Sequence, residues 1–289
     1  MTELLLQSEK EDTVEKKHTV DNSWHVLRQY TAARIALGRA GISVPTQHLL
    51  AFQLAHAQAQ DAVHLPLNTS LLIEEINSKP ECESITPLIA HSQVIDRSHY
   101  LQRPDLGRRL NVDSVELLKN YAAAKDDPYD LAIVIVDGLS SFAIQKNSSP
   151  LLHHLTQRIS QQSFSDQNIC RLAPVVIVKQ GRVAIGDEVG ALLNAKSVLV
   201  FIGERPGLSS PDSLGVYLTW APKVGLTDES RNCVSNIRPE GLAYNEAVTK
   251  IFYLLSEAHL KKLTGIHLKE RSQESESFLM QDDKNFLLS

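Results

Sequence analysis

Residues 198–208 read VLVFIGERPGL, an apolar run that gives way to a charged loop between Gly203 and Gly207. A short run rich in β-branched residues, with no alternating polar positions, is typical of a strand buried on both faces of a parallel sheet. Ligands of such sheets bind beyond the carboxyl ends of the strands, where this loop is placed. The two glycines let the backbone approach a ligand closely, and Pro206 stiffens the turn between them. We therefore expect a binding loop here.

Further apolar runs on both sides of this stretch predict an α/β fold. Strands are expected at residues 131–136, 174–178 and 215–220, the last towards an edge, and helices at residues 113–121, 150–159, 187–193 and 241–263. Strand, loop, helix and strand at this spacing imply right-handed crossovers and a mostly parallel sheet.

The chain before this sheet has a different pattern. Apolar residues recur at helical spacing from Trp24 towards Gly38 or Gly41, and a second helix is expected from Thr46. Residues 66–95 contain three prolines and predict a loop-rich connector. The charged N-terminus and the Ser/Glu-rich C-terminus have too little apolar surface to pack. We expect a mobile leader at residues 1–22, a helical N-terminal region at 23–110, the α/β domain at 111–268 and a disordered tail at 269–289.

Composition excludes several classes of protein. The chain has 289 residues, of which 43% are hydrophobic and 22% charged, as in a soluble globular protein. The formal charge of −5 supplies no basic field for nucleic acid. No apolar stretch approaches the roughly 20 residues that span a bilayer, so we expect a cytosolic protein. Cys82, Cys170 and Cys233 are widely spaced, which argues against a disulfide framework and against a metal site.

Four loops are expected to meet at the carboxyl edge of the sheet, at residues 137–141, 179–183, 203–208 and 227–237. These loops would bring together Asp137, Arg182, Glu204, Arg205 and Cys233. The turn-rich segment 101–110 adds three arginines. Guanidinium groups suit carboxylate or phosphate ligands, and the same pattern equally suits a salt-bridge cluster within the chain.

No catalytic set follows from these residues. The sequence lacks the G-x-S-x-G, Walker A, G-x-G-x-x-G and H-E-x-x-H patterns. Glu204 stands beside Arg205, which is more typical of an ion pair than of a general base. Arg231 near Cys233 favours a thiolate, but no histidine is nearby in the sequence. From the residues alone, the chain is predicted to bind a sizeable, partly anionic ligand.

Several unusual motifs occur in one order along the chain. They are RPDLGRR at 103–109, DGLS at 137–140, GRV at 181–183, GERPGL at 203–208 and CVSNI at 233–237. Together they resemble the small subunit of ethanolamine ammonia-lyase, over about residues 24–268. The resemblance implies a helical N-terminal part followed by a Rossmann-like domain. It also implies adenosylcobalamin as cofactor, conversion of ethanolamine to acetaldehyde and ammonia, and a hetero-oligomer with a large subunit that holds the substrate.

Carried over by motif, the family's cobalamin contacts fall on Val183, Glu204 and Cys233, and no catalytic residue is expected in this chain. No histidine stands in a D-x-H-x-x-G pattern, so the cofactor is expected to keep its own base as lower ligand. The leader leaves both the cytosol and a bacterial microcompartment open. Two other readings stay open from the residues: a nucleotide-binding regulatory module without a catalytic partner, and a hydrolase that uses Cys233.

Overall fold

The computed structural model describes residues 18–78, 86–123, 127–162, 164 and 170–269. Residues 1–17 of the predicted leader and residues 270–289 of the predicted tail lie outside the described residues. The chain divides into two compact units, residues 1–57 and residues 58–289. This division reflects only how compactly each part is packed, so it does not test the four segments expected from the sequence. Those segments stay a prediction.

In the first unit, the helix predicted from Trp24 towards Gly38 is wrong for most of its length. A short 3-10 helix, η1 (Ser23–Gln29), forms instead. Ala36 and Gly38 have positive φ angles of 50° and 74°, which interrupt a right-handed helix. The Arg28 guanidinium donates a hydrogen bond to the Ala36 carbonyl and so closes this turn.

The helix predicted from Thr46 is confirmed as α1 (Thr46–His64). The loop-rich connector predicted after it is wrong in part, because residues 66–95 contain the helix α2 (Thr69–Asn77) and the strand β1 (Leu88–His91). β1 pairs in parallel with β3 (Val176–Lys179) and forms one edge of the sheet. Its four residues are too few to produce a recognisable strand pattern.

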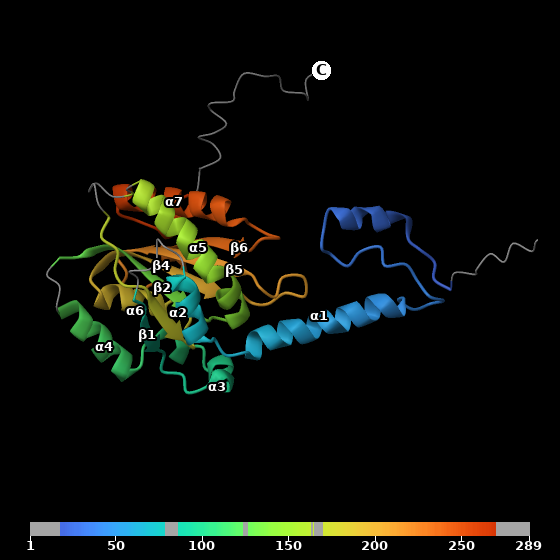
Figure 1. The fold of residues 1–289 in the computed structure, drawn as a ribbon, viewed down its shortest axis with the longest axis horizontal. Helices are drawn as coiled ribbons and strands as arrows, with labels where there is room; N and C mark the ends of the chain where they lie inside the picture. The colour runs from blue at the N-terminus through green and yellow to red at the C-terminus, as the bar shows by residue number, and fades with distance from the viewer. Residues whose placement is uncertain (1–17, 79–85, 124–126, 163, 165–169, 270–289) are drawn as a thin grey trace, which may run out of the picture. The chain divides into compact units, whose positions relative to one another are not determined.

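The second unit is built around a six-stranded sheet with the order β1-β3-β2-β4-β5-β6 (Figure 1). The remaining strands are β2 (Tyr129–Val136), β4 (Ala195–Gly203), β5 (Leu214–Trp220) and β6 (Arg231–Ile237). The first four strands in this order are parallel, while β5 and β6 continue the sheet antiparallel. The mixed α/β fold with a mostly parallel sheet is therefore confirmed.

One of two predictions near the end of the chain is wrong. The strand expected towards an edge at residues 215–220 is present as β5, which is the second strand from the edge, beside β6. Residues 227–237 were expected as a polar loop, and most of them form the edge strand β6. An edge strand exposes many of its side chains, so Ser235 and Asn236 face solvent while Val234 and Ile237 are buried. The resulting polar composition concealed the strand.

Helices cover both faces of the sheet (Figure 1). The remaining described helices are α3 (Arg97–Gln102), η3 (Leu106–Arg108), α4 (Val112–Ala123), α5 (Ser141–Gln161), α6 (Ile185–Leu192), η4 (Asp228–Ser230), α7 (Tyr244–Lys261) and η5 (Gly265–His267). α5 and α7 pack on one face, and α6 and α4 contribute to the core on the other. No helix in the described part of the chain is both long and apolar enough to span a membrane.

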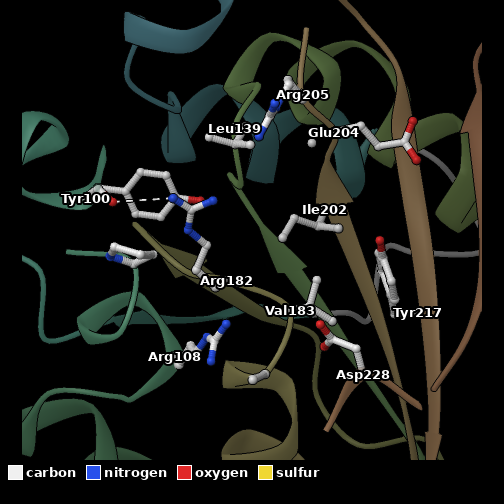
Figure 2. A pocket seen from close by; sticks show the side chains of 13 residues that line it. Tyr100, Arg108, Leu139, Arg182, Val183, Ile202, Glu204, Arg205, Tyr217 and Asp228 are labelled. Carbon is white, nitrogen blue, oxygen red and sulfur yellow. Dashed lines mark hydrogen bonds between the residues drawn. The ribbon is translucent and has the colours of Figure 1, made fainter. Parts of the chain in front are cut away.

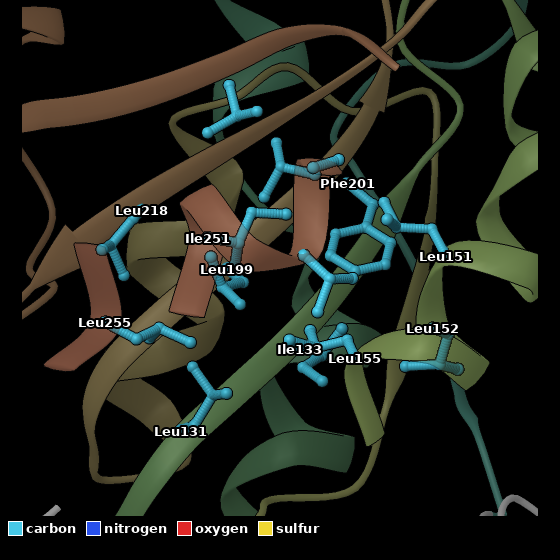
Figure 3. Packing of buried hydrophobic residues seen from close by; sticks show 14 of the residues in the cluster. Leu131, Ile133, Leu151, Leu152, Leu155, Leu199, Phe201, Leu218, Ile251 and Leu255 are labelled. Atoms are coloured by element: carbon cyan, nitrogen blue, oxygen red, sulfur yellow. The ribbon is translucent and has the colours of Figure 1, made fainter. Parts of the chain in front are cut away.

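The strand β4 is buried on both faces, as its sequence predicted. Successive strand residues point to opposite faces, so Leu199 and Phe201 join the core under α5 and α7 (Figure 3). Val198 and Val200 join the core under α6. Each fully buried side chain of this size contributes about 1.5–3 kcal/mol. The end of β4 is therefore held in place by core packing on both faces, and this fixes the start of the loop that follows it.

Two glycines let the ends of β2 and β4 approach each other. Gly138 has a φ angle of +59°, and a Cβ there would lie 2.4 Å from the Gly203 carbonyl oxygen. A Cβ on Gly203 would lie 2.0 Å from the Ser140 carbonyl oxygen. Both neighbours are backbone atoms inside the sheet edge, so neither can move without shifting a strand end.

We expect Gly203→Ala to lower the free energy of unfolding by about 3 kcal/mol, because the added methyl overpacks the junction of two strands. Urea unfolding followed by circular dichroism measures this change. Gly207→Ala is the matched control in the same loop, since its Cβ would meet only the Ser210 hydroxyl, which can rotate away. Equal destabilisation by the two substitutions would contradict the argument.

Candidate functional site

A cavity of about 460 Å³ opens where β2, β3 and β4 end (Figure 2). The loops after these strands contribute Leu139, Arg182, Val183, Glu204 and Arg205 to its lining. The segment of α3 and η3 contributes Tyr100 and Arg108, β5 contributes Tyr217, and η4 contributes Asp228. Each of the four segments predicted to meet at this edge therefore contributes to the lining of one cavity, the fourth through Asp228 alone.

Asp137 fastens two of these loops together and does not line the cavity. Its buried carboxylate accepts hydrogen bonds from the backbone N–H groups of Gln180 at 2.8 Å and Gly181 at 3.1 Å. Burial raises the pKa of Asp137 above its ordinary value, while these N–H groups and nearby Arg97 oppose the shift. Asp137 is thus a positioning residue that holds the loop after β3 against the end of β2.

Tyr100 supports the same loop from the other side. Its fully buried ring lies between two guanidinium groups, 4.5 Å from Arg97 and 4.2 Å from Arg182, measured to the ring centroid. Its hydroxyl donates to the Gly181 carbonyl at 3.0 Å, and its own backbone carbonyl accepts from the Arg182 guanidinium at 3.4 Å (Figure 2). Burial raises the pKa of Tyr100, so the hydroxyl keeps its proton. Arg182 is held by cation–π contact, and its buried Nε has no hydrogen-bond partner within the described residues.

Glu204 does not form the ion pair with Arg205 that its sequence suggested. Figure 2 shows its carboxylate pointing away from Arg205. Glu204 Oε2 accepts hydrogen bonds from the Ser213 hydroxyl and from the Asn236 N–H, the latter at 3.3 Å. A Cβ on Gly215 would lie 2.9 Å from Glu204 Oε1, so glycine at that position leaves room for the carboxylate. Nothing in the sequence marked Ser213 or Gly215 as its neighbours.

Cys233 lies in the middle of β6, opposite Tyr217 of β5. It does not line the cavity, but its thiol interacts with the Tyr217 hydroxyl, and Tyr217 does line it. Arg231 does not activate the thiol, because its guanidinium is bound to Asp187 and Asp228. Although Cys233 is an exposed residue, desolvation of its sulfur by neighbouring groups, together with the Glu204 charge, raises the pKa of Cys233 despite the opposing Tyr217 contact. The geometry therefore disfavours a thiolate nucleophile.

The arginines of segment 101–110 divide between two roles. Arg103 pairs with Asp105 at 2.7 Å and Arg109 pairs with Glu188 at 2.8 Å, as a salt-bridge cluster predicts. Arg108 and Arg205 instead line the cavity. Within the described residues neither of these two side chains forms a hydrogen bond or an ion pair. The cavity lining therefore contains two arginines and the Glu204 carboxylate that form no ion pair within the described residues.

Comparison with known proteins identifies the family of this chain. Residues 21–269 match the family model described as ethanolamine ammonia-lyase light chain. The chain belongs to this family. The ethanolamine ammonia-lyase small subunit of Ralstonia nicotianae is 47% identical over 283 residues, covering 98% of this chain and 100% of the relative. The small subunit of Pseudomonas fluorescens strain Pf0-1 is 52% identical over 252 residues, covering 87% of this chain and 88% of the relative.

The light-chain match confirms the resemblance carried by the five motifs. Its relatives are named as small subunits of a lyase, and that name implies a larger partner chain. Of the three contacts carried over from the ethanolamine ammonia-lyase family, Val183 and Glu204 lie in the cavity lining, and Cys233 lies outside the lining on β6, opposite Tyr217. Their role in binding stays a prediction.

In this light chain we expect Cys233 to react slowly with iodoacetamide at pH 7 and to accelerate only as the pH rises past 9, because its pKa lies above the ordinary thiol value. Mass spectrometry of the labelled peptide over a pH series measures the rate. Cys170 is the internal comparison, since burial raises its pKa to about 12 and should leave it slower still. Rapid labelling of Cys233 below pH 8 would contradict the assignment.

Proposed function

We propose that this chain holds adenosylcobalamin against a large subunit in an ethanolamine ammonia-lyase that converts ethanolamine to acetaldehyde and ammonia. The observation that carries the proposal is the position of Val183 and Glu204. These two residues come from different loops, were carried over by motif alone, and line the same cavity. Four parallel strands, with this cavity at the carboxyl ends of three of them, support a Rossmann-like description of the cofactor domain.

The lining residues fit the chemistry of a cobalamin. The periphery of such a cofactor carries amide groups and its nucleotide tail carries a phosphate, so it needs acceptors and cations. Glu204 Oε1 accepts no hydrogen bond from the described residues, and Ser213 and Asn236 hold the carboxylate through its other oxygen. The lone guanidinium groups of Arg108 and Arg205 supply positive charge. The cavity offers both kinds of partner.

The chain's own contribution would be to bind and orient the cofactor. When bound, adenosylcobalamin supplies the radical chemistry that amino-acid side chains do not provide. Glu204 would accept from a cofactor amide, and Val183 would present its backbone at the start of α6. Asp137 and Tyr100 keep the loop containing Val183 in place. Contacts of this kind accelerate a reaction only if they are stronger in the transition state than in the ground state.

A large subunit would complete the site. A cavity of about 460 Å³ holds only part of a molecule as large as a cobalamin. We therefore expect the rest of the cofactor to lie against the partner chain, which would also carry the ethanolamine site in a hetero-oligomer. The assembly would reside in the cytosol or inside a bacterial microcompartment.

Co-expression of this chain with its large-subunit partner tests the proposal. Acetaldehyde is assayed from ethanolamine with each chain alone and with both, in the presence and absence of adenosylcobalamin. Activity should require both chains and the cofactor. If the two chains form no complex and bind no cobalamin, the proposal fails, and the cavity should be screened with nucleotides as a regulatory module.

A further inference from the structure

Arg97, the first residue of α3, joins three segments of the second unit. Its Nε donates to the Val63 carbonyl at 2.6 Å, and its Nη1 donates to the Gly138 carbonyl at 2.8 Å. Nη1 also donates to Gln180 Oε1 at 3.4 Å. One guanidinium therefore holds the end of α1 and the loops after β2 and β3. Arg97 itself is not among the residues that line the cavity.

The loop after β3 contains a strained residue. Gln180 has a φ angle of 56°, which residues other than glycine rarely adopt. Such a conformation persists only where the surrounding contacts hold it. Its N–H donates to Asp137 at 2.8 Å, and its carbonyl accepts from the Ser92 hydroxyl at 2.7 Å. Because Val183 of the same loop lines the cavity, contacts that hold Gln180 also place a part of the lining.

Arg97 also supplies a positive charge near Asp137, whose buried carboxylate joins the same two loops. Burial raises the pKa of Asp137, while backbone N–H groups and the Arg97 charge oppose the rise. Tyr100, which the Asp137 charge also reaches, keeps its proton, and Arg182 lies over its ring. Without Arg97, Asp137 would take up a proton at a higher pH and would accept these hydrogen bonds less strongly.

Resting on the proposed function, we propose that Arg97 is a positioning residue, which holds the loops after β2 and β3 in the arrangement that binds the cofactor and does not contact the cofactor itself. The end of α1 belongs to this arrangement. The last carbonyls of a helix have no partner within it. Arg97 binds the carbonyl of Val63, and the Ser141 hydroxyl donates to the carbonyl of Leu65, just beyond α1.

Hydrogen–deuterium exchange of the 289-residue chain tests the positioning role without a partner or a cofactor. Arg97→Gln should speed the exchange of the Gln180 and Gly181 amides about tenfold or more, because it releases the loop that contains them. Arg97→Lys keeps the charge and should give a smaller increase. Arg103→Gln is the matched control at the other end of α3, where Arg103 is paired with exposed Asp105, and it should leave these rates unchanged.

Equilibrium binding of cyanocobalamin to the complex of both subunits tests the consequence for the ligand. Arg97→Gln should weaken binding about tenfold or more. The loss should grow as the pH is lowered from about 8 to about 5, because Asp137 then takes up a proton more readily than in the wild type. Arg97→Lys should keep the pH dependence of the wild type.

Unchanged exchange in Arg97→Gln, or in Arg97→Lys if the glutamine variant does not fold, overturns the positioning role. Faster exchange with unchanged cyanocobalamin affinity overturns it as well, and so does an equal loss of affinity in Arg103→Gln. If the wild-type complex binds no cyanocobalamin, the proposed function is wrong, and the exchange rates still decide whether Arg97 holds the loop.

Discussion

Glu204→Ala is expected to raise the apparent dissociation constant of the complex for adenosylcobalamin on the order of 100-fold, while the apparent constant for ethanolamine changes little. Ser213 and Asn236 hold Glu204 Oε2, and Oε1 remains free to accept from the ligand. Removing the carboxylate would leave a desolvated amide of the cofactor without its acceptor. A hydrogen bond to a charged group is worth about 1.5–3 kcal/mol, or roughly 10- to 150-fold in affinity, and the expected change lies in the upper part of this range.

Saturation curves of the co-expressed complex, with cofactor and ethanolamine varied separately, distinguish the two constants. Glu116→Ala is the matched control, because Glu116 is an exposed carboxylate of α4 that does not line the cavity. Ser213→Ala should give a smaller increase for the cofactor, since it loosens the carboxylate without removing it. Equal changes in the two constants for Glu204→Ala would refute the proposal that this chain binds the cofactor while the partner chain binds ethanolamine.

The second large effect concerns stability. Arg231→Met is expected to lower the free energy of unfolding by about 3–5 kcal/mol, because it leaves the charge of Asp187 buried and unpaired. The side chains of Arg231 and Asp187 are only 1% and 2% exposed. The guanidinium also donates to the Leu226 carbonyl at 3.1 Å, so the substitution frees a second acceptor. Urea unfolding monitored by circular dichroism measures the loss.

A double variant separates the net contribution of this ion pair to the free energy of unfolding from the destabilisation caused by removing only one partner. Asp187→Leu combined with Arg231→Met replaces both charges with apolar groups and should recover most of the lost stability. Arg103→Met is the matched control for the arginine substitution, since its partner Asp105 is exposed, and its unfolding midpoint should match that of the wild type. If the double variant is as unstable as Arg231→Met, the ion pair itself stabilises the fold.

The sequence predicted the parallel part of the sheet because its strands are continuous apolar runs. β2 and β4 are buried on both faces, which removes the polar alternation and makes them conspicuous. β1 and β6 lie at the edges of the sheet, where burial is partial. A strand with one face in solvent accepts polar residues, so composition cannot distinguish it from a loop.

Much of the candidate site could be located from the sequence for a related reason. The loops after three parallel strands must share one edge, so Arg182, Glu204 and Arg205 were correctly expected to meet. Cys233 was misplaced relative to them because its loop proved to be a strand. Tyr217 was missed, since an aromatic residue inside a strand usually signals core packing. Its place in the lining depends on the antiparallel turn after β4, for which the sequence contains no clear signal.

The hydrogen bonds that hold the loop after β3 join residues far apart in the chain. Gln180 is 43 positions beyond Asp137, and the carbonyl of Gly181 is 81 positions beyond the Tyr100 hydroxyl. The pairing of β2 with β3 spans a similar separation, from Val136 to Val178, and it brings these donors and acceptors together. Ligand affinity is therefore expected to depend on the central strands being paired, so a chain whose sheet is incomplete has no site.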